Sequence, residues 1–283
     1  MANQDTTDYK VTQIPALFLL VSALGYGADL KKDLTLFATF DGSTNASIAL
    51  GDKSIYSAPS YKEQDAAKPG LNIPDVQLAR GEGRRGDALR FTKKNTRALF
   101  YRTQGNLGFD PKNWTGAISF WLNLDPEQDL EPGFCDPIQI TDKAYNDSAI
   151  WVDFTKGERP RHFRLGVFGE LKLWNPRNLP ADKNPDFAKR LVVVEKHPFA
   201  RGKWTHVAIT WSGLGGGRGS ASLYVDGKPR GIAENIKEPF AWDPARGALR
   251  LGVNYVGLLD EVAVFRRALN SAEIQSLAAG NAP

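Results

Sequence analysis

The chain has 283 residues, of which 42% are hydrophobic, 11% aromatic and 24% charged, a balance typical of a globular protein with an apolar core. Its single cysteine, Cys135, excludes an internal disulfide framework and any zinc site built on cysteines, and no nucleophile motif surrounds it. The net charge of +4 is a mild excess. Nucleic-acid binding would need basic residues clustered on one face, so we expect no nucleic-acid partner.

Basic residues gather in two short, turn-like segments of the chain. The first segment contains Arg80, Arg84 and Arg85, and the second contains Lys93, Lys94 and Arg97. The simpler interpretation is a solvated loop surface. The alternative is attraction to an anionic partner such as an acidic polysaccharide.

The N-terminal segment has the pattern of a secretory signal. An apolar run over residues 16–24 is followed by small residues, although Lys10 is the only basic residue before it. The run is too short for a spanning helix, which needs about 20 apolar residues. We predict a signal peptide over residues 1–27, a linker over 28–32, and a secreted, periplasmic or cell-surface protein without a membrane span in its mature chain. An uncleaved anchor or a misassigned start is the alternative.

Short segments that alternate apolar and polar residues recur along the rest of the chain. They predict strands over residues 34–40, 88–91, 98–101, 116–124, 149–154, 161–167, 191–194, 204–211 and 220–225. Residues 125–148 and 171–190 are rich in turn-forming residues and predict long loops. Many short strands with little helical periodicity favour an antiparallel sandwich, here expected over residues 33–279 with a tail over 280–283.

Two local signals define the C-terminal part of this domain. Asp226-Gly227 is the dipeptide that a tight type I′ hairpin turn prefers, because both central residues need positive φ. Asn270 and Glu273 have the spacing of a capping box, with Ile274 and Leu277 on one helix face. The sequence therefore predicts one short helix at the end of the domain.

An ordered series of motifs resembles a known family. The motifs are Leu36-Phe-Ala-Thr-Phe-Asp-Gly42, Gly86-Asp-Ala-Leu-Arg-Phe91, Ile118-Ser-Phe-Trp121, Trp204-Thr-His-Val-Ala208, Leu223-Tyr-Val-Asp-Gly-Lys228, and Gly257-Leu-Leu-Asp-Glu-Val262 followed by Arg267-Ala-Leu269. They resemble the laminin-G-like jelly rolls of the concanavalin-A-like superfamily, especially the bacterial secreted kind. The resemblance implies an all-β jelly-roll sandwich of two antiparallel sheets, one of them concave, with one short C-terminal helix. Members bind sugars, proteins or sulfated glycans, and the fold does not decide which.

Strand alternation assigns side chains to faces. If Ile118, Phe120 and their counterparts on neighbouring strands point into the core, a polar and aromatic set points outward. This outward set consists of Trp121, Trp151, Asp153, Arg164, His206 and Tyr224. Aromatic rings beside hydrogen-bonding groups suit stacking against a sugar, so we expect a shared ligand-binding face, extended by the long loops at 125–148 and 171–203. The alternative is that these residues lie on separate strands or under the loops and never meet.

The resemblance also implies a structural calcium ion that ties the first strand to the last. The positions that match are Asp41, after the first strand, and Asp260, in the strand that begins at Gly257. Carboxylates mixed with backbone carbonyls are typical calcium ligands. The alternative is that Asp41 forms a turn with Gly42 and that Asp260 pairs with an arginine.

Catalytic signals are weak. The related retaining glucanases carry alternating carboxylates on one strand, about 5 Å apart, and no Glu-x-Asp-x-x-Glu pattern occurs in this chain. We therefore expect a non-catalytic secreted module that binds carbohydrate or an extracellular protein. A glycoside hydrolase or lyase on the same fold, and a purely structural or assembly domain, remain the alternatives.

Overall fold

The computed structural model describes residues 30–283, so the expected signal peptide and residues 28–29 of the expected linker lie outside the described residues. Two antiparallel sheets pack against each other as a sandwich. The nine-stranded sheet runs in the order β15 (Lys228–Ile236), β14 (Gly219–Val225), β13 (Thr205–Leu214), β8 (Trp114–Asn123), β17 (Gly257–Phe265), β1 (Leu34–Ala38) and β2 (Ile48–Ala49), with β6 (Ala88–Phe91) on β17 and β5 (Val76–Ala79) on β6.

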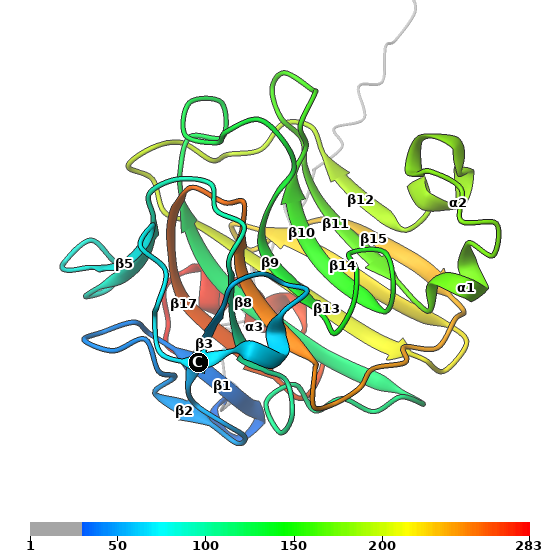
Figure 1. Cartoon of the computed structure of the whole chain (residues 1–283), viewed down its shortest axis with the longest axis horizontal. Coiled ribbons are helices and arrows are strands. Elements are labelled where there is room, and N and C mark those ends of the chain that lie inside the picture. Colours follow the sequence, from blue (N-terminus) through cyan, green and yellow to red (C-terminus); the bar gives the residue numbers. More distant parts are fainter. Residues whose placement is uncertain (1–29) are drawn as a thin grey trace, which may run out of the picture.

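The eight-stranded sheet runs in the order β12 (Leu191–Val194), β11 (Phe163–Phe168), β10 (Ala149–Phe154), β9 (Cys135–Thr141), β16 (Ala248–Val253), β7 (Ala98–Arg102), β3 (Ile55–Ala58) and β4 (Lys68–Pro69). Helices are short: α1 (Leu171–Trp174), α2 (Pro185–Ala188), α3 (Ser271–Ala278), and the 3₁₀ turns η1 (Leu30–Asp33), η2 (Gln64–Ala66) and η3 (Ala181–Lys183). Helices α1 and α2 lie at one side of the molecule and the β5 hairpin at the opposite side (Figure 1). The predicted sandwich with a short C-terminal helix is confirmed.

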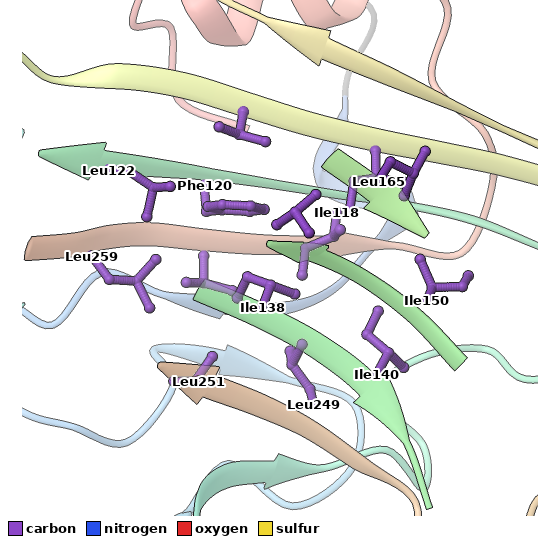
Figure 2. Packing of buried hydrophobic residues seen from close by; sticks show 14 of the residues in the cluster. Ile118, Phe120, Leu122, Ile138, Ile140, Ile150, Leu165, Leu249, Leu251 and Leu259 are labelled. Atoms are coloured by element: carbon purple, nitrogen blue, oxygen red, sulfur yellow. The ribbon is translucent and has the colours of Figure 1, made fainter. Parts of the chain in front are cut away.

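The core lies between the sheets and follows the predicted alternation. Figure 2 shows Ile118 and Phe120 of β8 near Ile138 of β9, with every labelled side chain in the space between the layers. These residues have no exposed surface. Fully burying such a side chain stabilises the fold by about 2 kcal/mol. The apolar side of each alternating strand therefore faces the core, as the sequence predicted.

The predicted turn and helix are also present. Asp226 and Gly227 have φ values of 50° and 72°, as a type I′ turn requires. In α3 the Asn270 side chain accepts from the Glu273 amide, and the Glu273 carboxylate accepts from the Asn270 amide. The apolar face of α3 packs on outward residues of the nine-stranded sheet, including Ala208 and Phe265, so the helix covers that face.

Two predicted loops contain regular structure. Residues 125–148 include β9, a central strand that pairs with β10 and β16. Asp136 and Pro137 obscure this strand in the sequence, because both residue types are depleted in strands. Pro137 has no amide to donate, and the β9–β10 register shifts next to it. Residues 171–190 contain α1, η3 and α2, which are too short to show helical periodicity. None of the helices among residues 30–283 is long and apolar enough to cross a membrane.

Candidate functional site

The six predicted ligand-binding residues do not share one face. Trp121, His206 and Tyr224 lie on β8, β13 and β14 of the nine-stranded sheet, whereas Trp151, Asp153 and Arg164 lie on β10 and β11 of the eight-stranded sheet. The outer faces of two packed sheets point in opposite directions, so the prediction of a single face was wrong. Alternation tells inward from outward in each strand, but it does not tell which sheet the strand joins.

Trp121, His206 and Tyr224, the three residues on the nine-stranded sheet, are packed against other residues of the chain. The Trp121 ring is only 6% exposed and lies 4.7 Å from the Arg84 guanidinium. His206 is fully buried, with Nε2 2.8 Å from the Ser119 hydroxyl, and burial lowers the pKa of His206 to about 4. The Tyr224 hydroxyl lies 3.4 Å from that of Ser271 at the start of α3. These contacts attach the β5–β6 hairpin and the C-terminal helix to the sheet.

The two expected calcium ligands bind the same loop. Asp260 Oδ2 accepts hydrogen bonds from the amides of Arg84 and Arg85 at 2.7 and 3.3 Å, and Oδ1 accepts from the Glu261 amide at 2.7 Å. Asp41 Oδ1 accepts from the Asp87 amide at 2.9 Å. Burial raises the pKa of Asp260 to about 7, although the three amides act against it.

These carboxylates offer few ligands to a metal. Among residues 30–283, no group of three or more acidic, histidine or cysteine side chains is placed to hold an ion. Calcium takes six to eight oxygen ligands, so an ion at Asp41 and Asp260 would need most of them from backbone carbonyls and water. The observed role of both side chains is to hold the loop at residues 84–87.

The second group of three forms a connected arrangement on the outer face of the eight-stranded sheet. Arg164 donates to both oxygens of Asp153, with Nε–Oδ1 at 2.9 Å and a second bond at 2.5 Å. The two residues are direct cross-strand partners, and Asp153 is 3% exposed. Burial raises the pKa of the Asp153 carboxyl, while the Arg164 guanidinium acts in the opposite direction. Bidentate pairs of this kind fix the orientation of both side chains.

Trp151 completes this group and shows why the strand next to it carries a glycine. The indole lies over Gly166, where a Cβ atom would come within 2.2 Å of the ring. Its Nε1 donates to the Tyr145 carbonyl at 2.7 Å. Trp151 therefore forms part of the outward surface of this sheet, which we call the floor of the site. Its indole N–H already donates a hydrogen bond within the protein.

The floor continues across the sheet as a row of outward residues. Cross-strand pairing places Trp151, Gln139, Arg250, Phe100 and Tyr56 in register on β10, β9, β16, β7 and β3. Gln139 accepts from Arg250 at 2.6 Å and donates to Asp136 at 2.7 Å. Burial, and then the charge of Asp153, raises the pKa of Asp136 well above its usual value.

Sequence reasoning missed Asp136, Gln139 and Arg250. Gln139 and Asp136 lie in β9, which was expected to be loop. The alternation of Ile138 and Ile140 around Gln139 was the available signal for this strand.

Two exposed rings border this floor. Phe134, just before β9, is 41% exposed, and Tyr145, just before β10, is 45% exposed. The Arg164 guanidinium lies 5.1 Å from the Phe134 ring centre and 5.5 Å from that of Trp151. The pKa of Tyr145 is raised, mainly by burial, and the charges of Arg164 and Asp136 also act on it. The rings and the Asp153–Arg164 pair are thus parts of one site.

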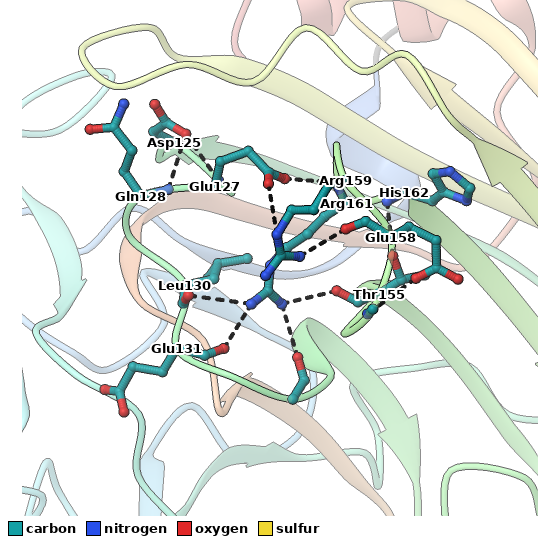
Figure 3. A network of polar contacts seen from close by, with 12 residues as sticks. Asp125, Glu127, Gln128, Leu130, Glu131, Thr155, Glu158, Arg159, Arg161 and His162 are labelled. Carbon is teal, nitrogen blue, oxygen red and sulfur yellow. Dashed lines mark hydrogen bonds and ion pairs between the residues drawn. The ribbon is translucent and has the colours of Figure 1, made fainter.

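Arg161 fixes the loop that carries Phe134. The guanidinium is 1% exposed and donates to backbone carbonyls on both sides of it, as Figure 3 shows: those of Leu130, Glu131, Gly133 and Thr155, at 2.9 to 3.3 Å. The Arg161 amide also donates to the Glu127 carboxylate at 2.6 Å. Residues 125–134 are therefore attached to the end of β10.

The insertion at residues 171–190 closes the site on another side. Trp174 and Phe187 pack against Phe168 and form an aromatic cluster with Trp151. Arg190 holds the insertion through a bidentate ion pair with Glu238, at 2.9 and 3.0 Å. The long loops therefore seal much of the sheet face and leave Phe134 and Tyr145 exposed, with the Arg164 side chain 14% exposed beside them.

Comparison with known proteins agrees with this architecture. The sequence model of the concanavalin A-like lectin/glucanases superfamily (Laminin_G_3) matches residues 102–275, which is more than half of the chain. The chain therefore belongs to that superfamily. No curated protein matches it by sequence.

Solved structures share the fold at low sequence identity. Domain 4 of AbnA, a GH43 extracellular arabinanase of Geobacillus stearothermophilus solved with arabinotriose, is 16% identical with a TM-score of 0.51, over 87% of this chain and 98% of that domain. The binding domain of botulinum neurotoxin serotype D is 11% identical with a TM-score of 0.56, over 90% of this chain and 52% of the toxin chain. A sialidase of Trypanosoma rangeli is 14% identical with a TM-score of 0.51, over 87% of this chain and 32% of the enzyme.

Proposed function

We propose that the protein is a secreted, non-catalytic carbohydrate-binding module whose site is the outer face of the eight-stranded sheet. The observation that carries the proposal is the pair of exposed rings, Phe134 and Tyr145, beside the fixed Asp153–Arg164 pair. A sugar presents an apolar face to an aromatic ring and hydroxyl groups to fixed donors and acceptors, and this surface offers both. An extracellular protein is the other class of partner expected from the sequence.

The comparisons support an oligosaccharide as the ligand. The arabinanase domain has nearly the same extent as this chain and was solved with arabinotriose. The T. rangeli enzyme and the toxin domains are longer, so their activities and receptors bear on this chain less directly.

A glycan array followed by titration calorimetry tests the proposal. We expect a double variant, Phe134→Ala with Tyr145→Ala, to bind the best array ligand about tenfold more weakly, because that factor corresponds to about 1.4 kcal/mol of lost ring contact. Ile232→Ala is the matched control, since Ile232 is 49% exposed on β15 of the other sheet. Equal binding by all three proteins would contradict the proposed site, and an array without signal would favour a protein partner.

Polysaccharide cleavage is the second candidate function, and one observation favours it. Asp136 and Asp153 lie on the neighbouring strands β9 and β10, and burial raises the pKa of both carboxyls. Carboxyls held in unequal environments can divide acid and base roles between them. A reducing-end assay on a broad polysaccharide panel tests this: turnover that is lost in Asp153→Asn would establish an enzyme, and no turnover would leave the binding module.

Secretion rests on the apolar run at residues 16–24 and has its own test. We expect the protein recovered outside the cytoplasm to begin near residue 28, as N-terminal sequencing would show. Recovery of the intact N-terminus inside cells would contradict secretion.

A further inference from the structure

Two cavities flank residues 59–67, a segment that packs on the outer face of the eight-stranded sheet. Tyr61 and Ala67 contact a small apolar cluster there that includes Phe100. The larger cavity has a volume of about 330 Å³, and its lining includes Ser57, Pro59, Lys68, Asn72 and Arg97. The smaller cavity has a volume of about 180 Å³, and its lining includes Gln64, Asp65, Phe100, Arg102 and Arg246. The smaller cavity shares Phe100 with the row of outward residues described above, but neither cavity includes Phe134, Tyr145, Asp153 or Arg164.

The charged groups in these linings are mostly basic. Four cationic side chains and one carboxylate, Asp65, line the two cavities. Arg246 pairs with Asp65 at 3.7 Å, but both side chains are largely exposed, and pairs of that kind contribute little. Within residues 30–283, Lys68 and Arg97 make no ion pair, and the Arg97 side chain donates only to the Asn72 carbonyl at 3.3 Å.

A fifth cation lies beneath the segment. Arg250 is 4% exposed, yet its hydrogen-bond partners are neutral. Its Nε and Nη2 atoms donate to Gln64 Oε1 at 3.1 and 2.8 Å, and its Nη1 atom donates to Gln139 Oε1 at 2.6 Å. Buried cations are usually paired with an anion, whereas no carboxylate lies within 4 Å of this one among the described residues. Asp136 and Asp142 act on it only from farther away. Gln64 thus occupies a position that suits a negatively charged oxygen.

Two aromatic rings lie next to the smaller cavity, but Phe100 is only 2% exposed. Phe100 lines it and stacks on Tyr56, with ring centres 5.9 Å apart. The Arg102 guanidinium lies 4.5 Å from the Tyr56 ring centre and donates to the Ala245 carbonyl at 3.2 Å. These contacts fix the position of the Arg102 guanidinium at the cavity, where it can donate to an anionic substituent of a sugar.

We propose that these two cavities bind the carboxylate or sulfate groups of an acidic polysaccharide, as subsites beside the Phe134–Tyr145 surface. This rests on the proposed function, because it names the class of glycan that the module takes. Arginine side chains bind carboxylates and sulfates through paired hydrogen bonds, and they bind neutral sugars without this charge contribution.

Calorimetric titration with polygalacturonate and with chondroitin sulfate tests the inference and separates the two anionic groups. Neutral arabinan and a single-stranded DNA oligonucleotide are the comparison ligands. We expect the pair Arg102→Ala with Arg246→Ala, and the pair Lys68→Ala with Arg97→Ala, each to weaken acidic-glycan binding about tenfold, a loss of about 1.4 kcal/mol.

A charge-matched control separates a site from general attraction. Arg218→Ala with Lys228→Ala removes the same charge from the β13–β14 turn and from the first residue of β15 in the other sheet. We expect this pair to change binding by less than about twofold, because exposed charges farther than a Debye length of about 8 Å are largely screened.

Gln64→Glu provides a second variant that leaves every cation in place. A carboxylate at this position would neutralise Arg250 and add a negative charge to the smaller cavity. We expect weaker binding of polygalacturonate and unchanged binding of arabinan.

Each possible result either supports or overturns the two subsites. Binding of acidic glycan that falls in both cavity pairs and in Gln64→Glu, but not in the control, supports the subsites. Binding of neutral glycan alone, an equal loss in the control pair, or equally tight DNA binding overturns the subsites and leaves the proposed function standing. No binding of any glycan overturns both proposals.

Discussion

On the outer face of the nine-stranded sheet, Trp121 is covered by Arg84 of the β5–β6 hairpin, His206 is buried beside Trp121, and neighbouring residues of that face are covered by α3. On the outer face of the eight-stranded sheet, Trp151 and Asp153 are just as deeply buried, but Phe134 and Tyr145 remain exposed beside them. The two faces therefore carry similar residue types with different surroundings. The comparison teaches that the segments packed over a strand, rather than the side chains on it, decide whether its outward residues can meet a ligand.

The largest expected effect tests the structural role of the covered face. Trp121→Ala should lower the free energy of unfolding by about 3 to 5 kcal/mol, because it removes a large buried ring beneath Arg84. Glycan affinity, measured at a temperature where the variant is folded, should not change. Urea unfolding measures the stability and titration calorimetry measures the affinity. A variant that loses glycan affinity without losing stability would place the binding site on the nine-stranded sheet and contradict the proposal.

The next effect tests the buried pair on the opposite face. Asp153→Asn leaves the Arg164 guanidinium without its counter-ion, so we expect the free energy of unfolding to fall by about 2 kcal/mol, since truncating one partner of a buried pair leaves an uncompensated charge. Glycan affinity should fall as well, because Arg164 would no longer be fixed beside Phe134. Unchanged affinity would remove the pair from the site.

The sequence predicted the sandwich and its inward faces well, because both depend on local alternation and turn residues such as Asp226-Gly227. It did not predict the site, because the position of a side chain there depends on pairing between distant segments. Gln139 and Arg250 meet only because β9 and β16 are neighbours, and Phe134 is held by Arg161 from 27 positions along the chain (161 minus 134). The grouping of Trp121 with Trp151 was wrong for the same reason: alternation contains no information about sheet membership.

A smaller effect concerns the pH dependence of the covered face. The pKa of His206 is about 4 in the folded protein and near 6.5 when unfolded, so the unfolded state binds more protons between these values and stability falls as the pH falls through them. Asp260, on the same face, acts in the opposite direction, because its raised pKa of about 7 makes the folded state the better proton binder between its ordinary value of 3.8 and about pH 7.

A variant isolates the histidine from the aspartate. We expect the change in the free energy of unfolding from pH 7.5 to pH 5 to be more favourable in His206→Gln than in wild type by roughly 2 kcal/mol, the value of about 1.5 pKa units. Urea unfolding at the two pH values checks this. Identical pH dependence in the two proteins would show that His206 is accessible to protons in the folded state.

The smallest expected effect concerns calcium, which we propose as a structural ion near Asp41 and Asp260. An ion that binds only the native state must stabilise it, here by about 1 kcal/mol because few carboxylates are available, so chelator should lower the melting temperature by roughly 2 °C. Asp41→Asn should abolish the difference. A melting temperature that is the same with calcium and with chelator would exclude the ion.

Amide hydrogen exchange, with and without the glycan that gives the strongest array signal, tests the central claim most directly. We predict that the ligand slows exchange in residues 131–148 and 163–168, around Phe134, Tyr145 and Arg164. We predict no change in residues 219–225 and 271–278, which lie on the covered face. Protection confined to β14 and α3 would contradict the assignment of the binding site to the eight-stranded sheet.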